Sequence, residues 1–230
     1  MLVVALDTAT PSVTAGVVEF AHDQAQRDPT PRTLGQRVTV DARAHGELLT
    51  PHLKDALAQA GLRLADVNAI VCGVGPGPFT GLRAGMVTAA ALGHSLDIPV
   101  YPVCTLDAIA VDAGEGEPLL VATDARRREV YWAAYDAHGT RVEGPNVERP
   151  ADVVARLAEL GVTRAAGQGA EMYREVWGLP VIGPNAPAPA GLVAAATAAL
   201  LDGTAPDSLT PLYLRRPDAV EPAARKRVSR

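Results

Sequence analysis

Two segments of the chain, 117 residues apart, share one order of features. In each segment an apolar run ends at an aspartate, and a short polar turn and a second strand-like run follow. The two copies comprise residues 2–6, Asp7 and residues 13–20, and residues 118–123, Asp124 and residues 129–135. An internal duplication of this kind indicates two similarly built halves. We therefore predict two lobes that each begin with a β-hairpin.

Strands and helices alternate after each hairpin, which is typical of α/β proteins. The predicted strands cover residues 36–41, 68–74, 98–103 and 163–167, and the predicted helices cover residues 45–60, 80–96, 104–113, 150–160 and 190–202. Because hairpins and crossovers occur together, we expect mixed sheets flanked by helices. We assign residues 1–103 to the first lobe and residues 104–230 to the second.

The predicted helix over residues 45–60 has apolar side chains at helical spacing and stops at Gly61. Pro51 leaves two alternatives for its start. Either Thr50 caps the helix and Pro51 takes its first position, or the helix begins near Gly46 and includes Pro51 in its first turns.

The stretch GVGPGPFTGLRAG, residues 73–85, connects a predicted strand to the helix at 80–96. A glycine-rich connection before a helix can bind phosphate. A P-loop needs a glycine–lysine pair that this stretch lacks, and Pro76 and Pro78 have no N–H group to offer a phosphate. We therefore interpret the stretch as a rigid turn, with Thr80 capping the helix.

Small residues are frequent along that helix: Gly81, Ala84, Gly85, Thr88, Ala89 and Gly93. A glycine inside a helix costs about 1 kcal/mol relative to alanine, so close packing has to compensate. We expect this helix to meet another helix at an interface.

Neither a metal site nor a catalytic residue is expected from the sequence. His45 and His52 are seven residues apart, which separates them by about 10 Å along a helix and prevents one zinc ion from binding both. Cys72 and Cys104 have no sequence neighbour that would lower their pKa, and their apolar surroundings predict buried thiols in a reducing compartment.

The formal net charge of −5 argues against a chain that holds nucleic acid by itself. Two basic clusters occur, at residues 126–128 and in the tail from Arg215 to Arg230. They fit a solvated surface, and they can contact phosphate once a partner supplies the rest of a site. No apolar run reaches the roughly 18–20 residues that span a bilayer, and the start lacks the features of a signal peptide. We expect a cytoplasmic protein without membrane contact.

The repeated hairpin also suggests a ligand. Paired strand–aspartate–turn–strand units hold a nucleotide and its metal between the lobes of actin-, hexokinase- and Hsp70-like proteins. The candidates for such a cleft are Asp7, Thr8, Thr10 and Asp124. In those proteins the turns usually contain glycine, which lets the backbone come close to the ligand. Here threonine, alanine and arginine occupy the turns, and their side chains leave less room for a ligand near the backbone. Two interpretations remain open at this point: the residues form a vestigial nucleotide cleft, or the two aspartates merely end their strands.

Five segments resemble the TsaB (YeaZ) family: LDTAT (6–10), HGELLTPHL (45–53), GVGPGPFTGLRAGM (73–86), DARRREVYWAAYD (124–136) and PLYLRRPDAVEP (211–222). They follow the family's order over nearly the whole chain, and PGPFTGLR is highly specific. The resemblance implies a two-lobed, actin-like (ASKHA) fold and a part in making N6-threonylcarbamoyladenosine at position 37 of certain tRNAs.

The resemblance further implies a noncatalytic subunit that binds and activates a TsaD enzyme, with the ATPase TsaE as a further partner. Members of the family pair with TsaD, or with a second copy when alone, through the two helices found here near residues 45–60 and 80–96. The interface residues carried over are His45, Glu47, Leu48, Leu49, His52, Phe79, Thr80, Leu82, Arg83 and Met86. We expect Arg83 to bond across the interface or to a nearby carboxylate.

By the same resemblance, tRNA is a partner only within the complex. The chain itself is expected to need no cofactor, with ATP and Mg²⁺ acting at the complex. Two alternatives stand beside this reading. One is an enzyme, either a weak ATP-binding or ATP-hydrolysing actin-like protein or a glycoprotease-like protein. The other is direct RNA binding through the arginine clusters, against which the acidic net charge counts.

Overall fold

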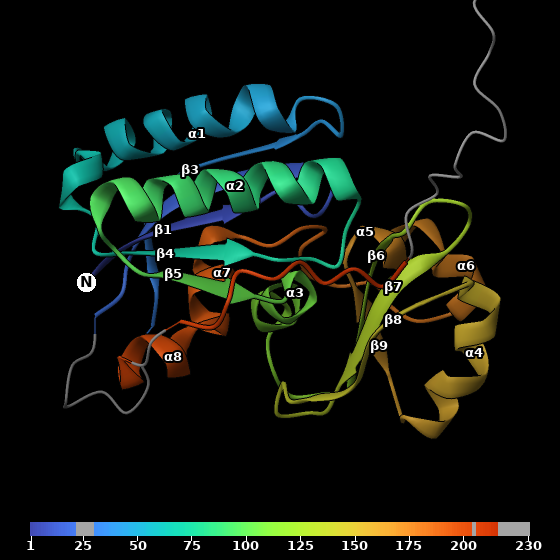
Figure 1. Ribbon diagram of the computed structural model, residues 1–230. Helices are drawn as coiled ribbons and strands as arrows, with labels where there is room; N and C mark the ends of the chain where they lie inside the picture. Colours follow the sequence, from blue (N-terminus) through green and yellow to red (C-terminus); the bar gives the residue numbers. More distant parts are fainter. Residues whose placement is uncertain (22–29, 204–205, 216–230) are drawn as a thin grey trace, which may run out of the picture.

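The computed structural model describes residues 1–21, 30–203 and 206–215, and in this part of the chain the strands form two mixed sheets (Figure 1). The first sheet has the order β3-β2-β1-β4-β5 and the second has the order β8-β7-β6-β9. The strands are β1 (Leu2–Asp7), β2 (Ser12–Glu19), β3 (Arg32–Val40), β4 (Ala69–Gly73), β5 (Val100–Val103), β6 (Leu119–Asp124), β7 (Val130–Tyr135), β8 (Arg141–Glu148) and β9 (Arg164–Ala166).

The two sheets repeat one arrangement. β1 pairs with β2 in antiparallel fashion and with β4 in parallel, and β6 pairs in the same way with β7 and β9. The duplication predicted from the two aspartate hairpins is therefore present in the sheets. The predicted α/β class, with mixed sheets flanked by helices, is confirmed.

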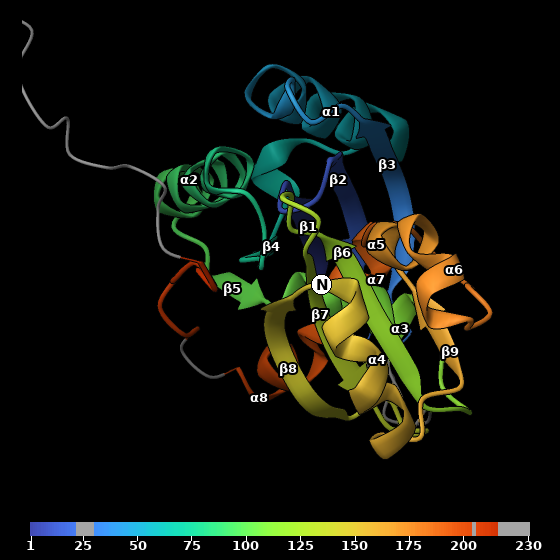
Figure 2. The ribbon, with the colours of Figure 1, turned by 90° about the vertical axis from the view of Figure 1, so that its right-hand side faces the viewer.

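Helices cover both sheets. The helices are α1 (His45–Ala60), α2 (Phe79–Leu96), α3 (Thr105–Ala113), α4 (Pro150–Glu159), α5 (Gln168–Met172), α6 (Arg174–Trp177), α7 (Pro189–Ala195) and α8 (Thr197–Asp202), with a single 3-10 turn at Leu64–Asp66. α1 and α2 lie on one face of the first sheet, and α4, α5 and α6 pack on the second (Figures 1 and 2). Among the described residues, no helix combines the length and apolar character needed to cross a membrane.

β1 is buried on both faces, which explains its uninterrupted apolar sequence. Val4 and Leu6 belong to the core beneath α1 and α2, whereas Val3 and Ala5 pack with α7 on the opposite face. Because side chains alternate along a strand, this single strand connects the two helical layers of the first lobe.

The last helices of the chain return to the first sheet. Leu192 and Val193 of α7 are buried against β1, and the hydroxyl of Thr14 donates a hydrogen bond to Pro187 O at 3.2 Å. Residues from beyond position 103 therefore complete the packing of the first sheet. α3 lies between the sheets, with Ala108 in the core of the first and Ile109 in the core of the second.

The structure confirms one local prediction and corrects two others. α1 begins at His45 and contains Pro51, so the second alternative for its start is confirmed. α2 begins at Phe79 after Pro78, without a side-chain cap, so the capping role predicted for Thr80 is wrong. The helix predicted over 190–202 is divided at Ala196 into α7 and α8.

Strand β8 was not predicted. Its sequence, RVEGPNVE, contains a Gly-Pro pair, which in a sequence pattern indicates a turn. β8 lies at the edge of its sheet and pairs only with β7, and an edge strand tolerates proline because one of its sides needs no partner.

From the sequence we expected the glycines of α2 to let another helix pack closely at an interface. In the structure they allow α2 to pack closely against other parts of the first lobe. A β-carbon at Gly81 would lie 2.8 Å from Thr8 O, and one at Gly85 would overlap the Thr8 hydroxyl oxygen. Near the end of the helix, a β-carbon at Gly93 would overlap the side chain of Val100. α2 therefore approaches its own sheet closely.

Two glycine-to-alanine substitutions on the neighbouring helices test this packing. Gly85→Ala is expected to lower the free energy of unfolding by about 1–3 kcal/mol, because the added methyl group displaces Thr8. Gly46→Ala on α1, where nothing lies within 4 Å, is expected to raise it by about 0.4–1 kcal/mol. Urea denaturation measures both, and equal effects of the two substitutions would contradict the packing argument.

Candidate functional site

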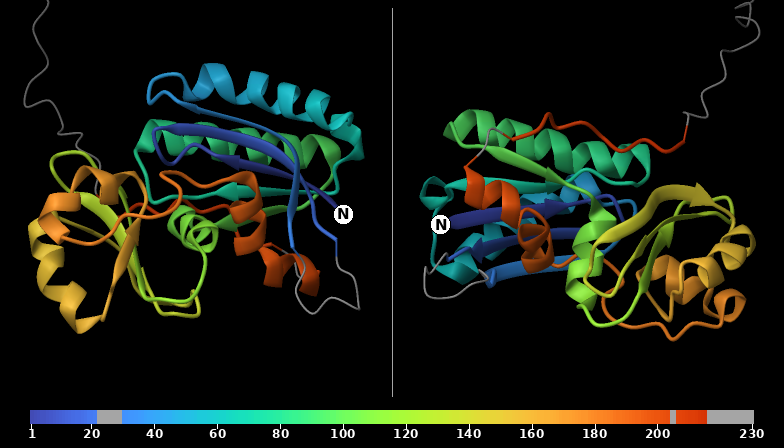
Figure 3. Two further views of the ribbon diagram at one scale, coloured as in Figure 1. Left: turned by 180° about the vertical axis from the view of Figure 1, so that it is seen from behind. Right: turned by 90° about the horizontal axis from the view of Figure 1, so that it is seen from below.

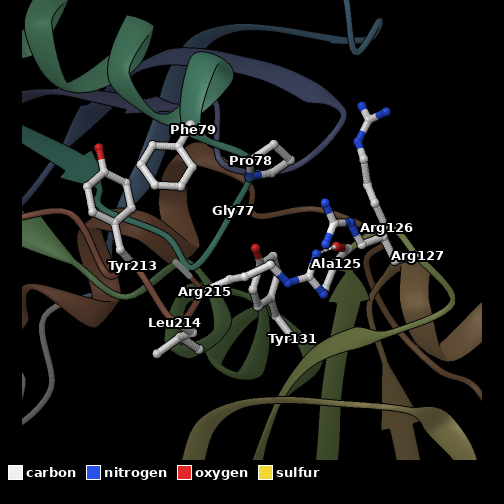
Figure 4. Close-up of a pocket in the computed structure, with 10 residues that line it drawn as sticks. All are labelled: Gly77, Pro78, Phe79, Ala125, Arg126, Arg127, Tyr131, Tyr213, Leu214 and Arg215. Carbon is white, nitrogen blue, oxygen red and sulfur yellow. Dashed lines mark hydrogen bonds between the residues drawn. The ribbon is translucent and has the colours of Figure 1, made fainter. Parts of the chain in front are cut away.

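The two aspartate hairpins meet at a cleft between the lobes, together with the loop that precedes α2. Two adjacent cavities open there. The larger, of 340 Å³, is lined by Thr8, Thr10, Pro11, Ala42, His45, Pro78, Phe79, Thr80, Gly81, Asp124 and Arg126. The smaller, of 250 Å³, is lined by Gly77, Pro78, Phe79, Ala125, Arg126, Arg127, Tyr131, Tyr213, Leu214 and Arg215 (Figure 4). Segments that are far apart in the sequence therefore share one surface.

Asp7 is fully buried at the end of β1 and does not line either cavity. The hydroxyl of Thr105 donates to Asp7 Oδ2 at 2.7 Å, and the N–H of Ala9 donates to Oδ1 at 3.0 Å. Burial raises the pKa of Asp7 to about 6, and these hydrogen bonds offset only part of that effect.

Thr8 is held by α2. Its hydroxyl donates to Gly81 O at 2.7 Å and accepts a hydrogen bond from Gly85 N–H at 2.9 Å. In a phosphate-binding turn the backbone N–H groups point at the ligand. In this turn the N–H group of Ala9 points at Asp7 instead.

The second aspartate differs from the first. Asp124 is half-buried, lines the larger cavity and accepts a hydrogen bond from Arg126 N–H at 2.8 Å. Of the four residues predicted for a nucleotide cleft, Thr8, Thr10 and Asp124 lie at the larger cavity, whereas Asp7 lies beneath it.

The two histidines bond within the first lobe. His45 Nε2 lies 2.8 Å from Thr10 O, and His52 Nε2 lies 2.9 Å from the hydroxyl of Thr39. Within the described ranges, no group of three or more His, Cys, Asp or Glu residues could hold a metal ion.

Both cysteines carry free thiols, as predicted. Cys72 is buried and Cys104 is half-buried, and burial raises the pKa of each, that of Cys104 to about 11.

The predicted interface residues divide by burial. Leu49, His52, Leu82 and Met86 are buried in the first lobe, so in this chain they are core residues. Those that reach the surface are His45, Glu47, Leu48, Phe79, Thr80 and Arg83, of which Glu47, Thr80 and Arg83 are exposed.

Phe79 and Arg83 have a partner in the chain that the sequence did not reveal. The C-terminal segment, residues 206–215, runs beside α2 (Figure 3, right). Tyr213 stacks on Phe79 with ring centroids 4.2 Å apart, and Arg83 Nε donates to the Tyr213 hydroxyl at 2.7 Å. We expected Arg83 to bond across the interface or to a nearby carboxylate. Among the described residues its hydrogen bond is to Tyr213 and not to a carboxylate, and a bond across the interface stays a prediction.

The same segment reaches the second lobe. Leu212 N–H donates to Val74 O at 2.9 Å, which fixes the segment on the first lobe. Arg215 then donates to Ala125 O at 3.0 Å and forms an ion pair with Glu129. Residues 216–230, which include the rest of the basic tail, lie outside the described residues.

Comparisons with known proteins agree on one family. The family model for TsaD, tRNA N6-adenosine threonylcarbamoyltransferase, matches residues 30–202. The tRNA threonylcarbamoyladenosine biosynthesis protein TsaB of Escherichia coli is 32% identical over 169 residues, which cover 70% of this chain and 68% of that protein. YeaZ from Pseudomonas aeruginosa has a TM-score of 0.74 at 27% identity, covering 93% of this chain and 99% of that one. The chain belongs to the TsaB (YeaZ) family.

Membership in the TsaB family confirms the resemblance carried by the sequence motifs, and the YeaZ structures confirm the actin-like (ASKHA) fold. A more similar relative, an uncharacterized protein of Mycobacterium tuberculosis, is 54% identical over 220 residues, which cover 94% of this chain and 93% of its own length.

The raised pKa of Asp7 predicts how stability varies with pH. Because the folded-state pKa of about 6 exceeds the ordinary value of 3.8, the folded protein binds an extra proton between those pH values. The free energy of unfolding therefore falls as the pH rises from about 4 to above 6, by about 3 kcal/mol at most from this group.

In Asp7→Asn this contribution disappears, since the amide does not titrate and its oxygen still accepts the N–H of Ala9. We expect the free energy of unfolding of this variant to fall less steeply between pH 4.5 and 7.5 than that of the parent protein. Urea denaturation at each pH measures the difference, and identical pH profiles would contradict the assignment.

Proposed function

We propose that this chain is an accessory subunit of a tRNA-modifying complex. It binds and activates a TsaD-type transferase, which transfers a threonylcarbamoyl group to a tRNA adenosine. The names of the TsaB relatives and the match to the TsaD family model support this proposal. TsaE is the proposed third component, ATP and Mg²⁺ act at the complex, and the cytoplasm is the proposed location.

The observation that carries the noncatalytic part of the proposal is the bonding of the β1–β2 turn. The Ala9 N–H donates to the buried Asp7 carboxyl, and the Thr8 hydroxyl bonds to the backbone of α2. A nucleotide-hydrolysing relative would need those groups for phosphate. The arrangement therefore favours a structural role for the hairpin over the alternative of an ATP-hydrolysing enzyme.

The proposed docking surface is the outward face of α1 and α2. Thr80 is exposed at the start of α2, and Val87, seven residues on, is 66% exposed on the same face. Glu47 is exposed on α1, the neighbouring helix (Figure 1). A large apolar side chain exposed in this setting gains free energy when a partner covers it. The chain alone is proposed to pair with a second copy through this face.

An omission assay tests the proposal. The assay contains unmodified tRNA, threonine, bicarbonate and ATP, together with TsaD, TsaE and the synthase that makes threonylcarbamoyl-AMP from the three small molecules. It is run with and without this chain, and the modified nucleoside is quantified. We expect product only when the chain is present. Equal product without the chain would overturn the proposal and favour the ATP-hydrolysing alternative.

A pair of matched variants tests the docking surface in the same assay. Val87→Asp places a charge on the proposed interface, whereas Val154→Asp places one on α4, where Val154 is 41% exposed in the other lobe. At a limiting concentration of the chain, Val87→Asp should reduce product about tenfold or more, corresponding to about 1.4 kcal/mol of binding free energy.

Val154→Asp should leave the amount of product unchanged. Gel filtration with TsaD should show the same difference in complex formation. Equal effects of the two variants would contradict the choice of surface. Leu82 is unsuitable for this test, because it is fully buried and a charge there would unfold the first lobe.

A further inference from the structure

Arginines from both basic clusters of the sequence line the smaller cavity. Arg126 and Arg127 come from the turn between β6 and β7, and Arg215 comes from the C-terminal segment (Figure 4). The pairing of Arg215 with Glu129 and Ala125 O holds these two segments together. The cavity therefore has a basic side that neither cluster forms alone.

Three of the other residues that line this cavity are aromatic, and they lie beside Gly77, Pro78, Ala125 and Leu214. Phe79 and Tyr213, which stack with an angle of 22° between their rings, lie across the cavity from Arg126 and Arg127, with Tyr131 between the two sides (Figure 4). Aromatic rings beside arginines bind single-stranded nucleic acid, because any base can stack on a ring while cations contact the backbone phosphates.

The size of the cavity limits what can enter. Its volume of 250 Å³ is below the roughly 300–1,000 Å³ of sites that enclose whole drug-sized ligands. One base fits such a volume, with its sugar and phosphates outside at the cavity mouth. Because the net charge of the chain is −5, attraction of a polyanion has to be local to this basic side.

Three arginines line the cavity and two carboxylates of the described chain lie near it, which leaves an excess of positive charge on this side. Glu129 forms an ion pair with Arg215, and Asp124, which lines the larger cavity, accepts the N–H of Arg126. Arg126 lines both cavities and is exposed, so its guanidinium is accessible from the cleft.

We propose that the smaller cavity receives one unstacked base of a single-stranded RNA segment, with the adjoining phosphates on Arg126 and Arg127. The base lies against the aromatic side formed by Tyr131 and Tyr213. This contact goes beyond the proposed function, because it gives the chain an RNA-binding site of its own, and it is tested without the transferase.

The test is fluorescence anisotropy of a labelled ten-nucleotide RNA of mixed sequence, titrated with the full chain at several salt concentrations. Arg126→Gln is compared with Arg128→Gln, a substitution in the same turn at an exposed residue that does not line the cavity. Both variants change the net charge equally. We expect Arg126→Gln alone to weaken binding and to reduce the slope of log affinity against log salt by about 0.7.

A second pair of variants tests stacking. Tyr213→Leu removes the ring and should weaken RNA binding about fivefold or more, whereas Tyr213→Phe keeps the ring and should bind almost as the parent does. Thermal unfolding of each variant establishes that the chain is folded. A duplex of the same sequence should bind several-fold more weakly, because its bases are stacked.

Three results would overturn the proposal. The first is no measurable binding of the single-stranded RNA. The second is equal loss in Arg126→Gln and Arg128→Gln, which would indicate attraction by net charge only. The third is a calorimetry result in which AMP or ATP binds, the binding depends on Arg126 and Tyr213, and the RNA does not bind. That result would make the cavity a site for free nucleotides. The omission assay is independent of all three.

Discussion

The close approach of the turn after β1 to helix α2 is the contact on which the rest of this structure depends. The hydroxyl of Thr8 lies between Gly81 O and Gly85 N–H and bonds to both. A β-carbon at Gly85 would overlap this hydroxyl, and one at Gly81 would lie 2.8 Å from Thr8 O. The same approach places Gly77 against the backbone of Ala9, where a β-carbon would overlap. The first hairpin, the loop before α2 and α2 itself therefore form one packed unit at the floor of the cleft.

This packing also accounts for the chemistry of Asp7. The carboxyl lies against Gly73, where a β-carbon would overlap it, and it is bonded by Thr105 and by the turn that follows it. In an actin-like protein the corresponding turn is suited to phosphate. Here the N–H group of Ala9 stabilises a buried carboxyl, which favours the accessory role that we propose. The carboxylate and the guanidinium that line the larger cavity, those of Asp124 and Arg126, both belong to the second hairpin.

The C-terminal segment joins the two lobes on the side of the cleft where α2 begins. Leu212 pairs with the backbone of Val74 in the first lobe, and Arg215 bonds to Ala125 and Glu129 in the second. Tyr213 lies between these attachments and covers Phe79. The surface at the start of α2 is thus built from three segments that are distant in the sequence: the start of α2, the β6–β7 turn and the C-terminal segment. Its aromatic and basic character exists only when all three lie together.

The sequence by itself determined the fold class, the duplicated hairpin and the end of α1 at Gly61, because apolar periodicity and residues such as Gly61 act over a few neighbouring positions. Family membership followed from motifs that are also local, such as PGPFTGLR. Periodicity did not find β8, whose Gly-Pro pair is tolerated only at a sheet edge. The tertiary structure alone decided that the glycines of α2 face Thr8, that Leu82 is core and that Arg83 bonds to Tyr213. Those outcomes depend on contacts between residues as many as 130 positions apart, and local sequence patterns do not encode such contacts.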